Sequence, residues 1–152
     1  MKSRLLLLSL VIWIFACGVG SQQDSDVHIP EGLDRRDELR FRQYLITGKQ
    51  IYLAQCSNCH QPNGQGLEAL YPPLAKSDFF VNNLAKSICM IKNGYSGPLT
   101  VNGTEYNMVM PALAHLTPLE IAEITTYIGN KWGNKVGFVQ VNDVEKILQD
   151  CE

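Results

Sequence analysis

Apolar residues recur every three or four positions in several stretches of this chain, which is the spacing of one face of an α-helix. The pattern predicts helices over 35–46, 48–56, 78–93, 117–132 and 142–150. We therefore expect an all-α protein. The residues expected to pack on the inner faces of these helices are Leu39, Leu45, Ile46, Val81, Leu84, Ala85, Ile88, Ile91, Ile121, Ile124, Ile128, Trp132, Val144, Ile147 and Leu148.

Polar residues and glycines at the predicted helix ends support these bounds. Thr117-Pro118-Leu119-Glu120 combines an N-cap threonine, a proline at the first helical position and a glutamate that completes a capping box. Thr47-Gly48-Lys49-Gln50 has the form of a second capping box, which would begin a new helix at Gly48. Gly94 is predicted to cap the helix before it. Asn102-Gly103 favours a hairpin turn within 97–107.

Cys56-Ser57-Asn58-Cys59-His60 is the segment that carries the chemistry. A Cys-x-x-Cys-His run is the attachment signature of c-type haem, because two thiols on one helical turn can each add to a haem vinyl group. The adjacent His60 then supplies an imidazole to the iron. A zinc half-site and a redox dithiol are the alternatives, but the sequence has no second ligand pair and the flanking pattern is helical.

A second axial ligand is available in the segment Tyr106-Asn107-Met108-Val109-Met110-Pro111. A thioether is a soft ligand that favours ferrous iron, and it would close the sixth coordination position. Met108 and Met110 are both candidates, while His115 is expected to lie on the surface ahead of the helix that starts at Thr117.

The first sixteen residues have the pattern of an export signal. A positively charged start precedes the apolar run 5–15, which is shorter than the ~20 residues that span a bilayer. Ala16-Cys17 then resembles a bacterial lipoprotein cleavage box, so Cys17 is the candidate lipidation residue. An ordinary secretory signal and an uncut anchor are alternatives, and all three place the protein outside the cytoplasm. Residues 17–34 are polar and are expected to form a flexible tether.

The net charge and the remaining cysteines bear on the possible functions and on the compartment of the protein. The 152 residues carry a formal net charge of −2, which gives no support to nucleic-acid binding. Two of the five cysteines, Cys89 and Cys151, belong to no motif. In an oxidising compartment they are candidates for a disulfide, and two buried free thiols are the alternative.

Taken together, these segments resemble the monohaem class I cytochrome c family of small bacterial proteins. The resemblance extends over about 48–134 and rests on segments in the family's order, namely Cys56-Ser57-Asn58-Cys59-His60, Tyr71-Pro72-Pro73-Leu74, Met110-Pro111-Ala112 and Trp132-Gly133-Asn134. It implies a cytochrome c fold over 47–152, packed around one covalent haem c and ending in a helical extension. The helix expected over 35–46 is an addition to that pattern.

The resemblance also implies roles for individual residues. Met110 matches the axial methionine, because that residue is followed by Pro-Ala in the family. A carbonyl at Pro72 or Pro73 would accept the second N–H of the histidine ligand. Further candidates for contact with the haem are Tyr71, Pro73, Leu74, Tyr95 and Tyr106.

The function expected from this resemblance is single-electron transfer, with no substrate transformed. The expected partners are redox proteins: a quinol-oxidising complex, a terminal oxidase or a periplasmic reductase. The expected location is the periplasmic side of a membrane, through a lipid anchor, with a soluble periplasmic form as the alternative. Three other functions stay open, namely an electron-entry subunit of a larger oxidoreductase, a five-coordinate haem sensor or peroxidase, and a zinc-binding interaction module.

Overall fold

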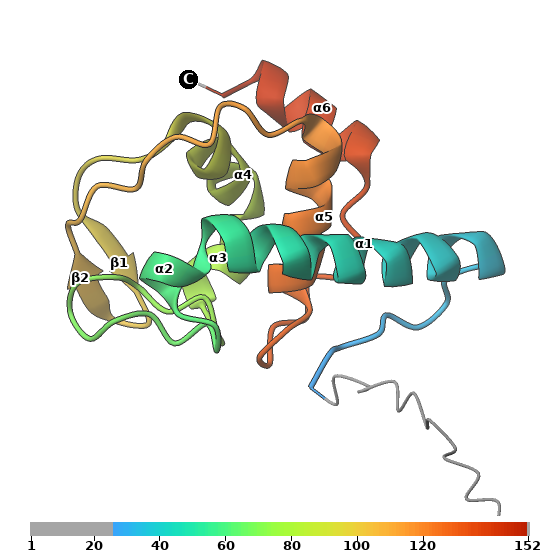
Figure 1. Ribbon diagram of the computed structural model, residues 1–152, viewed down its shortest axis with the longest axis horizontal. Coiled ribbons are helices and arrows are strands. Elements are labelled where there is room, and N and C mark those ends of the chain that lie inside the picture. Colours follow the sequence, from blue (N-terminus) through green and yellow to red (C-terminus); the bar gives the residue numbers. More distant parts are fainter. Residues whose placement is uncertain (1–25, 152) are drawn as a thin grey trace, which may run out of the picture.

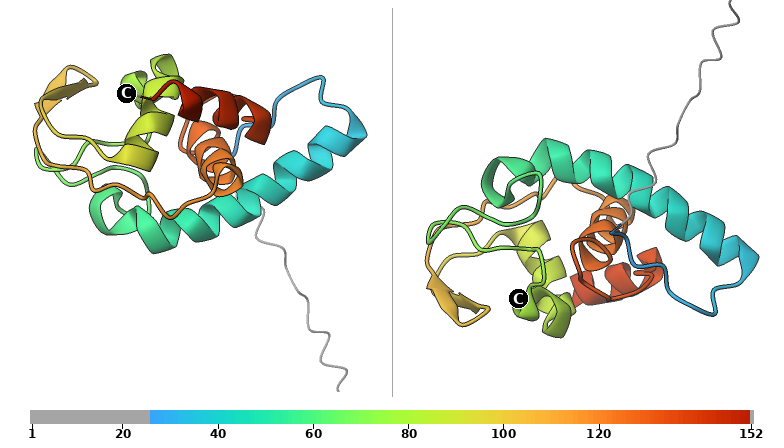
Figure 2. Two further views of the ribbon diagram at one scale, coloured as in Figure 1. Left: turned by 90° about the horizontal axis from the view of Figure 1, so that it is seen from above. Right: turned by 90° about the horizontal axis from the view of Figure 1, so that it is seen from below.

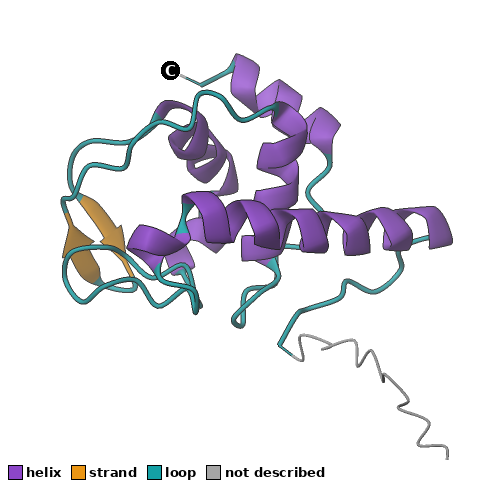
Figure 3. Ribbon diagram, in the orientation of Figure 1, coloured by secondary structure: helices purple, strands orange, loops and turns teal. Residues whose placement is uncertain are grey.

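The computed structural model describes residues 26–151, which form six helices and one two-stranded sheet (Figures 1 and 3). The expectation of an all-α protein is confirmed apart from this short sheet. The predicted export signal, Cys17 and the first part of the predicted tether lie outside the described residues. The elements are α1 (Arg35–Gln55), α2 (Ser57–His60), α3 (Asp78–Asn82), α4 (Leu84–Asn93), β1 (Leu99–Val101), β2 (Thr104–Tyr106), α5 (Pro118–Gly129) and α6 (Val141–Gln149). None of the described helices is long and apolar enough to cross a membrane.

Helix α1 is one continuous helix, so the predicted break at Thr47 is wrong (Figure 2). The Thr47 hydroxyl donates to the carbonyl of Gln43, one turn earlier in the same helix, at 3.2 Å. A threonine that bonds back in this way is compatible with a helix interior, so it does not begin a new helix. The predicted inner face of 35–46 is also wrong, because Leu39 and Ile46 are exposed whereas Phe41 and Tyr44 are buried.

Gly48 is the point at which α1 crosses α5. A Cβ atom at this position would lie 2.2 Å from the backbone oxygen of Glu123 and 2.8 Å from the Cβ of Tyr127. The glycine is therefore required by the close approach of two helix backbones and not by a helix end. This crossing holds the C-terminal half of α1 in place.

Gly48→Ala should lower the free energy of unfolding by about 1–3 kcal/mol, the usual cost of overpacking, even though alanine favours helices. Chemical denaturation of the purified protein measures this change. Gln50→Ala, at an exposed position of the same helix, is the matched control and should stay within about 0.5 kcal/mol of the parent. Equal stability of all three proteins would contradict the crossing.

The predicted helix over 78–93 is two helices, α3 and α4, that meet at Asn83. The Asn83 side chain donates to the carbonyl of Phe79 at 3.1 Å, and its backbone leaves the helical region with φ −128° and ψ 48°. Val81 is consequently 39% exposed instead of buried. The end of α4 is as predicted, since Gly94 has φ 77° and donates its N–H to Met90.

Two other predictions from local sequence are confirmed. Strands β1 and β2 pair antiparallel across Asn102 and Gly103, which both have positive φ. Helix α5 begins with the capping box of Thr117 and Glu120, and the hydrogen bonds from Thr117 lower the pKa of the Glu120 carboxyl. The helix ends at Gly129, three residues before the predicted end.

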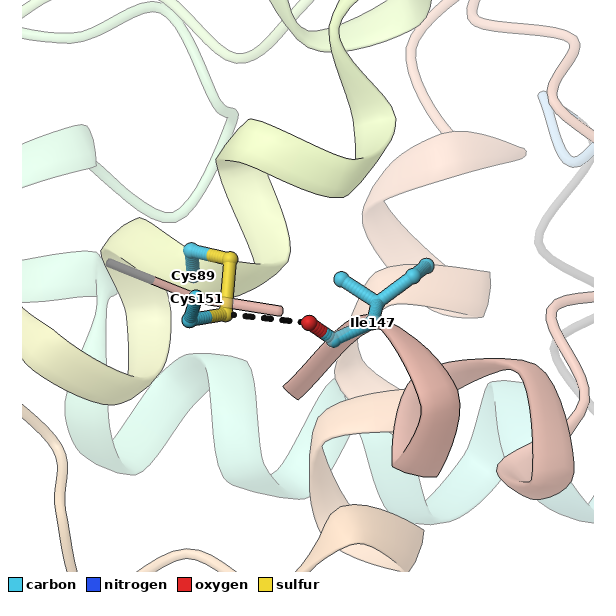
Figure 4. Close-up of a disulfide and its surroundings, with 3 residues drawn as sticks. All are labelled: Cys89, Ile147 and Cys151. Carbon is cyan, nitrogen blue, oxygen red and sulfur yellow. Dashed lines mark hydrogen bonds between the residues drawn. A yellow bond between two sulfur atoms is a disulfide. The ribbon is translucent and has the colours of Figure 1, made fainter. Parts of the chain in front are cut away.

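The C-terminal extension packs back on the domain. Asn130 donates its side-chain amide to Gly137 at 2.7 Å, and the Val139 N–H reaches the Thr126 hydroxyl at 3.2 Å. Helix α6 then lies against α4 and α5. Cys151, just after α6, is joined by a disulfide to Cys89 of α4 (Figure 4). The disulfide, and not the pair of free thiols, is therefore what the structure contains.

The end of the predicted tether is not free of the domain. Asp26 forms an ion pair with Lys131, whose side chain is 7% exposed. The N–H of His28 donates to the carbonyl of Asn130 at 2.7 Å. The last part of the segment predicted to be a flexible tether therefore contacts the domain, because the end of α5 offers a backbone acceptor that the sequence pattern does not reveal.

Candidate functional site

The Cys-x-x-Cys-His segment forms the corner between α1 and α2. The N–H of Cys56 donates to the carbonyl of Tyr52 at the end of α1. The N–H groups of Cys59 and His60 donate to the carbonyl of Cys56. Both thiols are unbonded, with Cys56 buried and Cys59 half-buried. All three side chains of the motif line the same cavity.

The orientation of His60 is fixed by the loop that follows it. Its Nδ1 donates to the carbonyl of Pro72 at 2.9 Å, so the acceptor is Pro72 and not Pro73. The Nε2 atom is therefore the nitrogen left with a lone pair for a ligand. Burial lowers the pKa of His60, and the hydrogen bond to Pro72 opposes that shift. The imidazole is thus kept in the neutral form that binds metals.

The loop itself is tightly closed on the motif. The N–H groups of Leu74 and Ala75 both donate to the carbonyl of Gly64, and the N–H of Gly66 donates to His60. Gly66 has positive φ and a Cβ there would lie 2.2 Å from the carbonyl oxygen of Tyr71. The short loop therefore brings the 71–74 segment beside the imidazole.

Two residues outside the cavity wall hold this loop in place. Asn134 donates its amide to Leu74 at 2.7 Å and to Ile128 at 2.8 Å, which ties the loop to α5. Trp132 packs against Tyr52 and lies so close to Gly64 that a Cβ there would be 2.5 Å from its ring. The Trp-Gly-Asn segment at the end of α5 is thus a support for the site and not a part of the cavity wall.

Met110 reaches the cavity from a separate segment, which runs from β2 to α5 (Figure 1). Its backbone exchanges two 2.9 Å hydrogen bonds with Tyr95, just beyond the end of α4. The N–H of Leu113 donates to Ile91, which fixes the other side of the segment. Met108 also lines the cavity but is 46% exposed, and His115 is exposed and lies outside the lining.

The remaining cavity wall is mostly apolar. Tyr71, Pro73, Leu74, Tyr95 and Tyr106, the other candidates from the sequence, all line it. Wall residues that the sequence analysis did not assign to the site are Phe79, Phe80, Met90, Ile91, Leu99, Val101, Leu113 and Ile128. All but Leu113 are apolar residues of predicted helices or of the hairpin, and Leu113 follows Met110 in the segment that leads to the helix at Thr117. The available signal for these residues was a second apolar face on the predicted helix over 78–93.

Comparison with known proteins places this arrangement in a family. The family model for cytochrome c matches residues 45–132, which is more than half of the chain. The chain belongs to the cytochrome c family. This cytochrome c therefore has the all-α cytochrome c fold, binds covalent haem c and is an electron-transfer protein.

Two groups of relatives are similar to this cytochrome c. Cytochrome c-552 of Thermus thermophilus is 40% identical over 93 residues, which cover 57% of this chain and 69% of the relative. The cytochrome c subunit of a quinone alcohol dehydrogenase from Gluconobacter oxydans is 28% identical over 103 residues. A similar subunit from Komagataeibacter europaeus is 30% identical over 105 residues. Those matches cover 66% and 67% of this chain but only 21% and 22% of the two subunits.

The residues around the cavity fit a haem c. Ser87 lines the cavity with its hydroxyl buried, and that oxygen has no hydrogen-bond partner within the described part of the chain. A buried hydroxyl that lacks a protein partner in a mostly apolar wall can bond a polar atom of a group that fills the cavity. Burial raises the pKa of the Cys56 thiol to about 12, with a smaller contribution from Cys59. A free thiol here would stay protonated at neutral pH and a thioether is likewise uncharged, so neither form buries a charge in the cavity wall.

Proposed function

We propose that this cytochrome c is a single-electron carrier whose haem is bonded to Cys56 and Cys59 and ligated by His60 and Met110. One observation carries the proposal: two thiols, an oriented imidazole and a thioether line a single apolar cavity. Haem c bound there supplies reversible one-electron chemistry of its iron.

Each of these residues has a distinct task in the proposal. Cys56 and Cys59 fix the position of the macrocycle, and the Pro72 carbonyl orients the His60 imidazole and raises its basicity as a ligand. With haem c bound, the Met110 thioether would be a second ligand of the iron, and as a soft ligand it would favour the reduced state and exclude other ligands. The apolar wall, with Pro73, Leu74, Tyr71 and Tyr106 among its members, limits water near the iron.

A double variant, Cys56→Ala/Cys59→Ala, tests the attachment. The parent, produced in a haem-maturing bacterial host, should carry one covalent haem by intact mass and by a pyridine haemochrome spectrum. The double variant should carry none, because no sulfur remains to form a thioether. Cys89→Ala/Cys151→Ala removes two sulfurs elsewhere and should keep the haem. A parent without added porphyrin mass would refute the proposed function.

A subunit of a larger oxidoreductase is the second candidate function, and the dehydrogenase relatives favour it. In either case the partners would be redox proteins, such as a quinol-oxidising complex, a terminal oxidase or a periplasmic reductase. Co-purification after mild detergent extraction separates the candidates, since a free carrier should elute alone. A five-coordinate sensor or peroxidase is disfavoured because the Met110 side chain lies in the cavity wall.

The proposed location is the periplasmic face of a membrane, with residues 1–16 removed and Cys17 as the lipidated first residue. Cys17→Ser should move the protein from the membrane fraction to the soluble periplasmic fraction after a high-salt wash, because a lipidated cysteine can no longer form. Cell fractionation followed by haem staining of both fractions measures this. Retention of the variant in washed membranes would contradict the lipid anchor.

A further inference from the structure

The outward side of α1 carries a row of apolar residues that nothing in the described chain covers. Leu39, Ile46 and Leu53 are 62%, 57% and 46% exposed. They are seven residues apart, which is close to two helical turns, so they lie in one line along the helix. The residues that α1 buries against the domain are Phe41, Tyr44, Gly48 and Tyr52, on the opposite side of the same helix.

Basic residues accompany this row. Helix α1 carries Arg35, Arg36, Arg40, Arg42 and Lys49, all exposed, against two acidic residues, Asp37 and Glu38. Two of the arginines pair with these acids, Arg40 with Asp37 and Arg42 with Glu38, but their side chains remain 43% and 49% exposed. Such surface pairs are weak and leave the Arg42 guanidinium accessible to other anions, whereas the Arg40 guanidinium also lies over the Phe138 ring.

The charge of α1 therefore differs in sign from that of the whole chain. The helix carries five basic and two acidic side chains, whereas the full chain has a net charge of −2. Apolar side chains flanked by arginines and lysines on an exposed helix face are the pattern of a helix that lies in a membrane interface. Anionic headgroups would attract the basic residues of such a surface.

A second copy of this chain is a poorer match for the same surface. Two α1 helices packed face to face would bring two positively charged surfaces together, and like charges across an interface oppose association. The apolar row is also one residue wide, since the neighbouring exposed positions include Gln43 and Gln50. That width suits shallow insertion between headgroups better than the broad apolar seam of a stable helix pair.

We propose that the outer face of α1 binds an anionic bilayer surface, with Leu39, Ile46 and Leu53 toward the acyl boundary and the arginines among the headgroup phosphates. This inference rests on the proposed export and lipid anchor. Because an anchored domain stays near the bilayer, its effective concentration there is high and a weak contact is sufficient. The haem-binding segment starts directly after Gln55, so the cavity would then be held beside the bilayer at one end of a helix that lies along it.

The test uses the haem-loaded mature chain with Cys17→Ser, so that any binding comes from the domain itself. Sedimentation with vesicles of phosphatidylcholine plus phosphatidylglycerol, and with phosphatidylcholine alone, measures the affinity. We expect binding to the anionic vesicles that weakens with salt and little binding to the neutral ones. Leu39→Gln/Ile46→Gln should weaken binding about tenfold, because two side chains lose their apolar burial.

A control variant outside α1 tests whether the loss of vesicle binding is specific to the α1 surface. Val81→Gln/Leu119→Gln changes two exposed apolar residues that lie outside α1, and it should bind like the parent. Their exposures of 39% and 44% are lower than the 62% and 57% of Leu39 and Ile46. The proposal is overturned if the α1 variant binds like the control, if neutral vesicles bind equally, or if sedimentation velocity shows a dimer that the α1 variant disrupts. An unchanged haem spectrum in every variant would show that such a failure concerns the α1 surface alone and not the electron-transfer function.

Discussion

Met110→Ala should open the sixth coordination position of the haem and lower the reduction potential of the protein. Loss of the soft thioether leaves a site that water or hydroxide can occupy, and such hard ligands favour the ferric state. Axial ligands set the reduction potentials of haem proteins over roughly 0.8 V, so the decrease in potential should be a sizeable part of that range. The parent should resist azide and carbon monoxide, whereas the variant should bind them. Potentiometric titration and visible spectra with each ligand measure both effects.

Met108→Ala is the matched control for this result. Met108 lines the same cavity two residues away, but its side chain is 46% exposed and its backbone lacks the paired hydrogen bonds that join Met110 to Tyr95. We expect this variant to have a spectrum like that of the parent and to bind neither azide nor carbon monoxide. The ligand assignment fails if Met108→Ala opens the iron and Met110→Ala does not.

Removal of the Cys89–Cys151 disulfide should have the largest effect on stability. The bond closes a segment with a sequence separation of 62 residues. The loss of chain entropy that such a closure imposes on the unfolded state corresponds to about 4 kcal/mol. Cys89→Ser/Cys151→Ser should therefore lower the free energy of unfolding by about this amount, as measured by urea denaturation with the haem in place.

Retention of the haem is the control for the disulfide variant. Because neither cysteine lines the cavity, the double variant should retain the covalent haem and its spectrum in the absence of denaturant. Treatment of the parent with a reductant should reproduce the lost stability without any mutation. A decrease below about 1 kcal/mol in both experiments would show that packing of α6 against α4 and α5 suffices to hold the C-terminal extension.

Features encoded by adjacent residues could be predicted from the sequence. The capping box at Thr117, the glycine cap at Gly94 and the Asn-Gly hairpin each depend on contacts within about one turn of chain, and each is confirmed. Thr47 shows the limit of that reasoning. Its hydroxyl can cap a new helix or bond back within an existing one, and the choice depends on α5, which lies across Gly48 and far away in sequence.

At the candidate site, too, only the features that depend on neighbouring residues could be predicted from the sequence. The thiols and the imidazole share one turn, so their proximity follows from the motif alone. The choice between Pro72 and Pro73 depends on how the 61–73 loop closes, which no local rule decides. The cavity wall depends on α4, where Ile88 faces the core while Met90 and Ile91 also reach the cavity. A helix with two apolar faces has no single stripe, and its periodicity cannot assign residues to one or the other.

The absence of a break in α1 has a consequence for how electrons would be exchanged. A straight helix of 21 residues is about 32 Å long, and here it leads from the N-terminal segment directly to the haem-binding cysteines. With no joint at Thr47, the haem cannot pivot relative to the start of the domain. If the haem faces a donor and an acceptor in turn, α1 and the haem-binding segment would reorient together as one rigid body, which would include release of α1 from the proposed bilayer contact.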